Sequence, residues 1–242
     1  MAFGKGYIIG FATAICVVAS LGVSGASMGL KPFQDVNRAR AQQEKVLRAV
    51  GLAGGDNELS GQAITDTYNE RIKVVVVDRS GAEVDKTLDE VEVENKAAKA
   101  AGKLPRWLVV YKRVDASGKA EAYALALEGS GLWGPLYGYL SIQPDMATVG
   151  GATFDAPKET PGLGAEIMNA KFQDQWNGKS VRKGGELVPV RVVKGEAKTV
   201  CGSGVDHCVD GVSGATITSR GVDAMVQAAI TDYGPYLERL KK

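Results

Sequence analysis

The segment from Asp210 to Ser219 is the first place where residue types and spacing suggest chemistry. It reads Asp-Gly-Val-Ser-Gly-Ala-Thr-Ile-Thr-Ser and stands directly before the clearest helical pattern of the chain. Small residues that lead into a helix leave backbone N–H groups exposed at the positive end of its dipole, which suits a phosphate. The competing interpretation is an ordinary N-cap, since Asp, Ser and Thr are favoured there for local hydrogen bonding. On composition alone, the cap is the simpler interpretation.

A second segment, Glu159-Thr160-Pro161-Gly162-Leu163-Gly164, predicts a tight loop between a strand and a helix. Two glycines around one leucine allow the backbone to lie against a flat ligand, with Leu163 as an apolar wall. The alternative is a turn without a ligand, because Gly and Pro are common turn residues.

Trp133 lies between glycines in a third segment, Gly129-Ser130-Gly131-Leu132-Trp133-Gly134-Pro135. An indole in this setting is either a stacking surface for a ligand or a core anchor after a bend. The segment by itself favours the anchor.

Cys201 and the pair His207-Cys208 form a fourth group. His207 is the only histidine of the chain, so the ligands of an ordinary four-coordinate zinc site are not available, and no metal is predicted. As sequence neighbours, His207 and Cys208 would point apart, which argues against a nucleophile pair. A disulfide between Cys201 and Cys208, in an oxidising compartment, and two free thiols remain open. No catalytic acid–base residue is predicted.

The composition is that of a folded protein of one or two domains. The chain has 242 residues, 45% hydrophobic and 24% charged, with a formal net charge of +1. This charge gives no general attraction for nucleic acid, so none is expected as a partner. The sequence also lacks the glycine-rich fingerprints of nucleotide-binding loops.

The N-terminal region contains a run without charged residues from Gly6 to Leu30. As a helix it spans roughly 37 Å, enough to cross a hydrocarbon core of about 30 Å. A cleaved signal peptide is the alternative, since Ser24-Gly25-Ala26 offers small residues at a cleavage site. The run continues past that site and is preceded by a single basic residue, Lys5, which favours a retained anchor.

Basic residues after the run outnumber those before it. The positive-inside rule alone would therefore keep the rest of the chain in the cytoplasm. The residues concerned are Lys31, Arg38, Arg40, Lys45 and Arg48.

The remaining pattern predicts an α+β fold: a single N-terminal transmembrane helix followed by one mixed α+β domain. The expected boundaries are 1–31 for the anchor, 32–55 for a juxtamembrane helix and 56–242 for the domain. An apolar spacing of i, i+3, i+4 and i+7 predicts a C-terminal helix with a break or kink at Gly234-Pro235. The other expected helices are 33–52, which either continues the anchor or turns at Pro32, and 165–176, while 85–103 is a surface helix or loop. Strands are expected at 72–77, 107–114, 120–127, 136–142, 148–154 and 188–193.

The motifs together resemble those of a known family. Asp210-x-x-Ser213-Gly214-Ala215-Thr216 resembles the flavinylation motif of the FMN-binding domain family, whose last threonine carries FMN through a phosphoester. Glu159 to Gly164 resembles the second signature of that family, a loop against the isoalloxazine ring. The single membrane helix and Gly131-Leu132-Trp133-Gly134 resemble the C subunits of sodium-translocating NADH:quinone oxidoreductases more than the G subunits of Rnf-type complexes.

The resemblance implies a flavoprotein subunit that relays electrons and has no NADH or quinone site of its own. Its implied partners are the other subunits, a flavin transferase for maturation, and a bacterial inner membrane with the FMN domain on the periplasmic side. The alternatives are the G subunit of an Rnf-type ferredoxin:NAD complex and an anchored binding or assembly protein with non-functional flavin motifs. The implied FMN-binding residues are Thr216, as the covalent site, with Ser213, Gly214, Ala215, Thr218, Glu159, Thr160, Pro161, Gly162, Leu163, Gly164 and Trp133, and Asp210 completes the motif.

Overall fold

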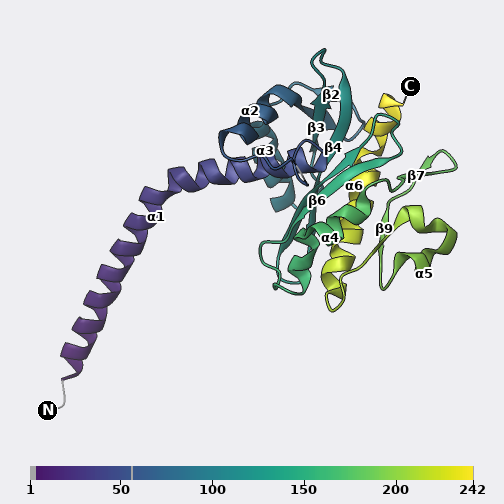
Figure 1. Cartoon of the computed structure of the whole chain (residues 1–242). Helices are drawn as coiled ribbons and strands as arrows, with labels where there is room; N and C mark the ends of the chain where they lie inside the picture. Colours follow the sequence, from purple (N-terminus) through teal and green to yellow (C-terminus); the bar gives the residue numbers. More distant parts are fainter. Residues whose placement is uncertain (1–3, 56, 242) are drawn as a thin grey trace. The chain divides into compact units, whose positions relative to one another are not determined.

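The computed structural model describes residues 4–55 and 57–241 and has two parts (Figure 1). One is the N-terminal portion of a long helix, α1 (Lys5–Ala49), up to Gln42. The other is a compact mixed α+β unit that begins at Gln43 and includes the last turns of α1. The predicted α+β class with one N-terminal apolar helix is confirmed, while the predicted domain boundaries stay a prediction.

The helix α1 is continuous through Pro32, so its two predicted segments form one element. An internal proline removes one hydrogen bond and crowds the preceding turn, but it does not end this helix. The most apolar window of α1 has a mean hydropathy of 2.1, and none of it is buried. By length and composition, α1 is therefore able to cross a membrane.

A six-stranded antiparallel sheet forms the centre of the compact unit. Its strand order is β2-β1-β3-β4-β5-β6. Five of the six predicted strands are confirmed here, with ends shifted by up to three residues. The strands are β1 (Ile72–Asp78), β2 (Glu83–Val84), β3 (Trp107–Val114), β4 (Ala120–Ser130), β5 (Pro135–Ile142) and β6 (Val149–Asp155).

The C-terminal helix α6 (Thr216–Leu240) packs on one face of this sheet. The packing is close: a Cβ added at Gly129 would lie 2.7 Å from the Met225 Cβ. Of the expected break or kink at Gly234-Pro235, the break is absent, because α6 continues to Leu240. Burial of the helix against the sheet, together with hydrogen bonds of the Tyr233 hydroxyl to the carbonyls of β3 and β4, outweighs the bond lost at the proline.

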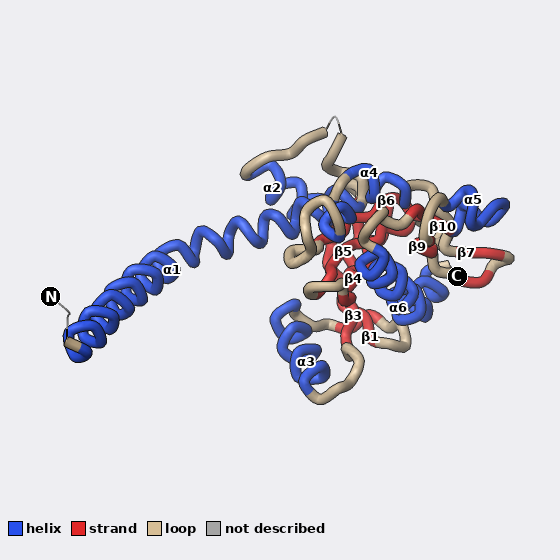
Figure 2. Tube along the Cα trace, turned by 90° about the horizontal axis from the view of Figure 1, so that it is seen from below, coloured by secondary structure: helices blue, strands red, loops and turns tan. Residues whose placement is uncertain are grey.

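The opposite face of the sheet is covered by the end of α1 and by α2 (Gln62–Arg71). Residues alternate between the two faces along a strand, and Tyr111 and Tyr139 belong to the second hydrophobic cluster whereas their neighbours belong to the first. Val46 and Leu47 of α1 are fully buried in this cluster. Figure 2 shows α2 and α6 on opposite sides of the sheet.

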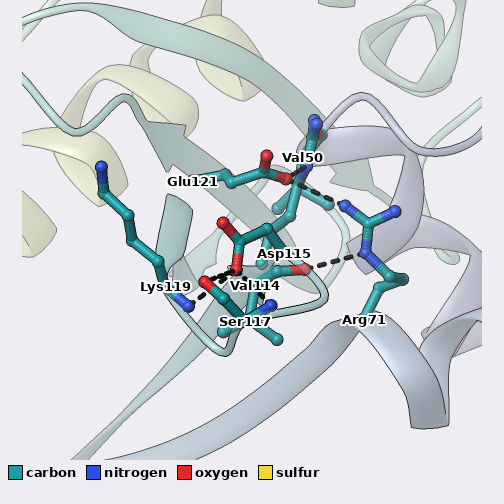
Figure 3. Close-up of polar contacts among 8 residues, drawn as sticks. Val50, Arg71, Val114, Asp115, Ser117, Lys119 and Glu121 are labelled. Carbon is teal, nitrogen blue, oxygen red and sulfur yellow. Dashed lines mark hydrogen bonds and ion pairs between the residues drawn. The ribbon is translucent and has the colours of Figure 1, made fainter.

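A polar network fixes the residue after α1 to the edge of the β3–β4 hairpin (Figure 3). The Arg113 guanidinium donates to the Val50 carbonyl at 2.9 Å and to the Glu121 carboxylate at 2.9 Å. Arg71, at the end of α2, donates to the same carboxylate and to the Val114 carbonyl. These bonds hold the C-terminal end of α1 and the end of α2 on the hairpin.

Two predicted elements are wrong. The predicted helix 165–176 is divided into 3-10 turns η1 (Gly164–Met168) and η2 (Asp174–Trp176) around α4 (Ala170–Gln173). Asn169 is extended, and its side chain donates locally to Glu166, a competition with helical bonds that is typical of Asn.

The predicted strand 188–193 is reduced to β9 (Arg191–Val193), which pairs in parallel with β10 (Cys208–Asp210). Pro189 lacks an N–H donor and so interrupts the apolar run. The remaining elements are α3 (Leu88–Ala100), which confirms a helix within 85–103, β7 (Arg182–Lys183), β8 (Glu186–Leu187), α5 (Ala197–Cys201) and the 3-10 turn η3 (Gly202–His207).

Candidate cofactor site

The three glycine-rich segments of the sequence come together around one pocket of about 240 Å³. One wall is the β4–β5 turn, another is the loop after β6, and the third is the start of α6. The lining residues are Leu132 and Trp133 from the turn, Glu159, Thr160, Leu163 and Gly164 from the loop, and Gly214, Ala215, Thr216, Ile217 and Thr218 from the helix start. Nine of the predicted site residues therefore line this pocket, and their roles stay predictions.

The start of α6 presents unpaired backbone donors to the pocket. Thr216 is the first helical residue, and the N-cap position is occupied by Ala215, which forms no side-chain capping bond. The first helical hydrogen bond runs from the Ser219 N–H to the Ala215 carbonyl at 2.9 Å. The N–H groups of residues 216–218 thus have no partner within the helix, and the positive end of its dipole is uncapped.

The N-cap interpretation of the motif is therefore wrong: no Asp, Ser or Thr occupies the cap. Asp210 lies outside the pocket, where its carboxylate accepts the Ala197 N–H at 2.6 Å. Its own N–H donates to the Gln175 side chain at 2.8 Å. Asp210 fixes the junction between β10 and α5.

Glu159 connects the three walls of the pocket. Its side chain is buried, with 7% of the residue exposed. One carboxylate oxygen accepts a hydrogen bond from the backbone N–H of Trp133 at 2.7 Å. The other accepts a hydrogen bond from the Thr218 hydroxyl at 2.7 Å. One side chain thus joins the β4–β5 turn, the loop after β6 and the first turn of α6.

The rim of the pocket is apolar and exposed. Trp133 is 64% exposed and Leu163 is 44% exposed, so neither is a core anchor. Contiguous exposed apolar side chains around a pocket are typical of ligand or partner sites. Leu132 and Ile217 also line the pocket and are exposed; both belong to the motifs of the sequence but were not among the implied FMN-binding residues. The sequence does offer a sign of exposure for Ile217, because this apolar residue lies outside the i, i+3, i+4, i+7 pattern that forms the buried face of α6.

Three further predicted residues lie at the edge of this pocket rather than in it. Gly162, Ser213 and Asp210 line a neighbouring groove of about 520 Å³. Pro161 is exposed in the intervening loop. Gly162 and Gly214 both have a φ of +77°, a conformation that favours glycine and allows the two chain segments to approach.

The first turns of α6 are held in place from the other side by an ion pair. The Arg191 guanidinium of β9 donates to both carboxylate oxygens of Asp223, at 2.8 and 3.0 Å. The hydrogen bond to this carboxylate raises the pKa of Arg191. The Val192 N–H donates to the same carboxylate at 2.9 Å, so the position of α6 relative to β9 is fixed by three bonds.

Cys201 and Cys208 form a disulfide that joins the end of α5 to β10. The open choice between a disulfide and two thiols is therefore resolved in favour of the disulfide. His207 does not face a thiol; its Nδ1 lies 2.8 Å from the Ser180 carbonyl oxygen.

The chemistry of the pocket fits a flat anionic cofactor. The uncapped helix start suits a phosphate, the Thr216 hydroxyl lies at that point, and the exposed Trp133 and Leu163 offer apolar faces for a ring. The volume is below the usual range of about 300–1,000 Å³ for ligand pockets, so a ligand with ring, side chain and phosphate would extend into solvent.

Comparison with known proteins agrees with this geometry. The profile of the FMN-binding domain family matches residues 131–231, which contain every wall of the pocket. The fold and site thus define an FMN-binding domain behind an apolar N-terminal helix.

Relatives of this chain belong to one class of protein within that domain family. The C subunit of the Na(+)-translocating NADH-quinone reductase of Pseudomonas aeruginosa is 34% identical over 231 residues, 89% of this chain and 87% of that protein. Its counterpart in Neisseria meningitidis is 32% identical and covers 94% of this chain and 91% of its own. The crystal structure of the counterpart from Parabacteroides distasonis has a TM-score of 0.71 and 35% identity, covering 86% of this chain and 96% of its own.

The chain therefore belongs to the family formed by the C subunits of Na(+)-translocating NADH-quinone reductases. The alternative, the G subunit of an Rnf-type complex, is not favoured.

Proposed function

We propose that this protein is the membrane-anchored flavoprotein subunit of a sodium-translocating NADH:quinone oxidoreductase, in which it relays electrons between neighbouring redox centres. The observation that carries the proposal is the meeting of three segments at the uncapped start of α6, in a chain whose relatives are named as a component of that reductase. FMN supplies reversible uptake and release of electrons. The protein supplies its position and surroundings.

The proposed attachment point of FMN is the Thr216 hydroxyl, as a phosphoester. Thr216 is the first residue of α6 and lines the pocket, so the remaining negative charge of a phosphodiester would lie at the positive end of the helix dipole. This placement is worth a few tenths to about 1 kcal/mol. Gly214 and the small Ala215 before it leave room for a flavin transferase to reach the hydroxyl.

The apolar rim is the proposed contact surface for the ring. Trp133 and Leu163 are large, apolar and exposed, and both line the pocket. A ring between them would bury apolar surface that otherwise faces water, at about 25 cal/mol per Å². Glu159, Gly164 and Thr160 complete the wall behind it.

The proposed anchor is α1, which would hold the domain at the bacterial inner membrane beside the other subunits. We place the FMN domain on the periplasmic side. The Cys201–Cys208 disulfide supports this side, because disulfides persist in oxidising compartments.

The basic residues after the apolar run argue for the cytoplasm by the positive-inside rule, which counts Lys and Arg near the ends of the span. Lys45 lies 2.5 Å from the Asp155 carboxylate, and Arg48 lies 2.9 Å from that of Glu44. Arg38 also lies 4.0 Å from the Asp35 carboxylate, so three of the five basic residues have acidic partners within the protein. Because the rule counts Lys and Arg whether or not they are paired, the proposed periplasmic side rests on the disulfide and on the resemblance rather than on charge.

Flavin attachment tests the proposal directly. The full chain, co-expressed with a flavin transferase, is denatured, run on a gel and examined for flavin fluorescence, and the masses of its peptides are measured. We expect one FMN on the peptide that contains Thr216 in wild type and none in Thr216→Val. A wild-type protein without bound flavin would instead favour an anchored binding or assembly protein.

A further inference from the structure

Glu159 has a defined place in the pocket that neither an ordinary turn nor a direct cofactor ligand explains. We propose that it is a positioning residue and a fixed negative charge: it holds the three walls of the pocket together and lowers the midpoint potential of the flavin. This inference rests on the proposed function, because it concerns a flavin in this pocket.

Both oxygens of the Glu159 carboxylate are engaged by the protein itself. The Trp133 N–H and the Thr218 hydroxyl donate to separate oxygens, each at 2.7 Å. An ionised carboxylate only accepts hydrogen bonds, so this pair of donors matches the charged form. Hydrogen bonds to a charged acceptor are roughly twice as strong as those between neutral groups.

The negative charge is not neutralised by a nearby cation. Among residues 4–55 and 57–241, no Lys, Arg or His forms an ion pair with Glu159. Its favourable surroundings are the two donors and the N-terminal turn of α6, to which Thr218 belongs. Because Glu159 is 7% exposed, solvent screens its field much less than that of a surface carboxylate.

Two glycines leave the space that the carboxylate occupies. A Cβ added at Gly131 would lie 2.5 Å from one of its oxygens, and a Cβ at Gly164 would overlap the other and the Thr218 hydroxyl. Gly131 and Gly164 come from two different walls of the pocket. Their role is therefore packing against Glu159, in addition to any contact with a ring.

The charge has a consequence for the cofactor. Each electron that enters a flavin makes the ring more negative unless a proton accompanies it, and a buried carboxylate in the same pocket opposes this change. Removing the charge while keeping the shape should therefore favour the reduced form. The hydrogen bonds and the charge are separable, because a glutamine keeps the bond from Trp133, reverses the direction of the bond with Thr218, and loses the charge.

The experiment compares three variants of the full, flavinylated chain by redox titration, with amide hydrogen exchange of Trp133 as a second readout. In Glu159→Gln, the side-chain carbonyl still accepts the Trp133 N–H and the amide group donates to the Thr218 hydroxyl. We expect attached FMN, unchanged protection of the Trp133 amide and a more positive midpoint potential. In Glu159→Ala, we expect the protection of the Trp133 amide to fall at least tenfold.

The matched control is Glu128→Gln, which removes one charge from the exposed end of β4, where Glu128 pairs with Lys99. We expect a smaller shift of the potential than in Glu159→Gln, because this charge is paired and in contact with water.

The possible outcomes distinguish a failure of the proposed FMN function from a failure of the roles proposed for Glu159. A wild-type chain that carries no FMN overturns the proposed function and this inference with it. FMN attached as proposed, with the same potential in Glu159→Gln as in wild type or an equal shift in Glu128→Gln, overturns the electrostatic role alone. Unchanged Trp133 protection in Glu159→Ala overturns the positioning role.

Discussion

The Thr218 hydroxyl donates a 2.7 Å hydrogen bond to the Glu159 carboxylate, and both side chains are buried. The bond joins the first turn of α6 to a loop 59 residues earlier in the chain. The same carboxylate accepts the backbone N–H of Trp133, so one side chain joins α6 and the loop after β6 to the β4–β5 turn.

Thr218→Val should destabilise the protein by about 1–3 kcal/mol, because it leaves a buried carboxylate oxygen without its donor while nearly preserving side-chain volume. Thr231→Val is the matched control: it lies on the same helix and its hydroxyl donates only to the Gln227 carbonyl at an exposed site. Urea denaturation of both variants measures the difference. Equal stability of the two would show that the Glu159–Thr218 bond contributes nothing net.

Thr216→Val should abolish covalent FMN and leave the fold nearly unchanged. The substitution removes one hydroxyl at the first position of α6, which is partly exposed, so the free energy of unfolding should change by less than about 0.5 kcal/mol. Thermal unfolding and flavin fluorescence of the denatured protein are measured together. A variant that retains its covalent flavin refutes the assignment of this residue.

Leu163→Ala should keep the attached flavin but change its surroundings. Leu163 lines the pocket at its rim, and Thr216 lies on another wall, so the attachment chemistry does not require the leucine. We expect a shifted visible spectrum and midpoint potential. If both stay as in wild type, Leu163 does not contact the ring.

The sequence predicts the parts of this site that lie in contiguous motifs, but not the contacts between distant segments. Thr216 and Leu163 belong to motifs contiguous in sequence, so their neighbourhood was predictable. The bonds of Glu159 were not, since they join residues 26 and 59 positions apart and one donor is a backbone N–H. Backbone donors carry no sequence signature.

The same distinction applies to the fold. Strands such as β3 have strong β-branched and aromatic patterns and were predicted to the residue. The helix α6 overrode its Gly234-Pro235 signal because tertiary contacts of the helix outweigh local preference. The short β9 was overestimated because an apolar run alone does not reveal its pairing partner, β10, which is 17 residues further on.

The Cys201–Cys208 disulfide should stabilise the folded protein. It closes a short loop with a sequence separation of 7, for which the chain-entropy estimate is about 2–3 kcal/mol. A Cys201→Ser, Cys208→Ser double variant should lose about this amount in urea denaturation. The matched control is wild type in reductant, which should lose a similar amount; no change in either would show that the bond is not formed in solution.

Charge counting and the disulfide disagree about the side of the membrane on which the domain lies. The positive-inside rule, which counts the basic residues after the apolar run, places the domain in the cytoplasm. The disulfide between Cys201 and Cys208 requires an oxidising compartment to persist. A reporter that is active only outside the cytoplasm, fused to the C-terminus of the full chain, should therefore be active. The matched fusion carries a reporter that works only in the cytoplasm, and activity from that fusion would overturn the periplasmic placement.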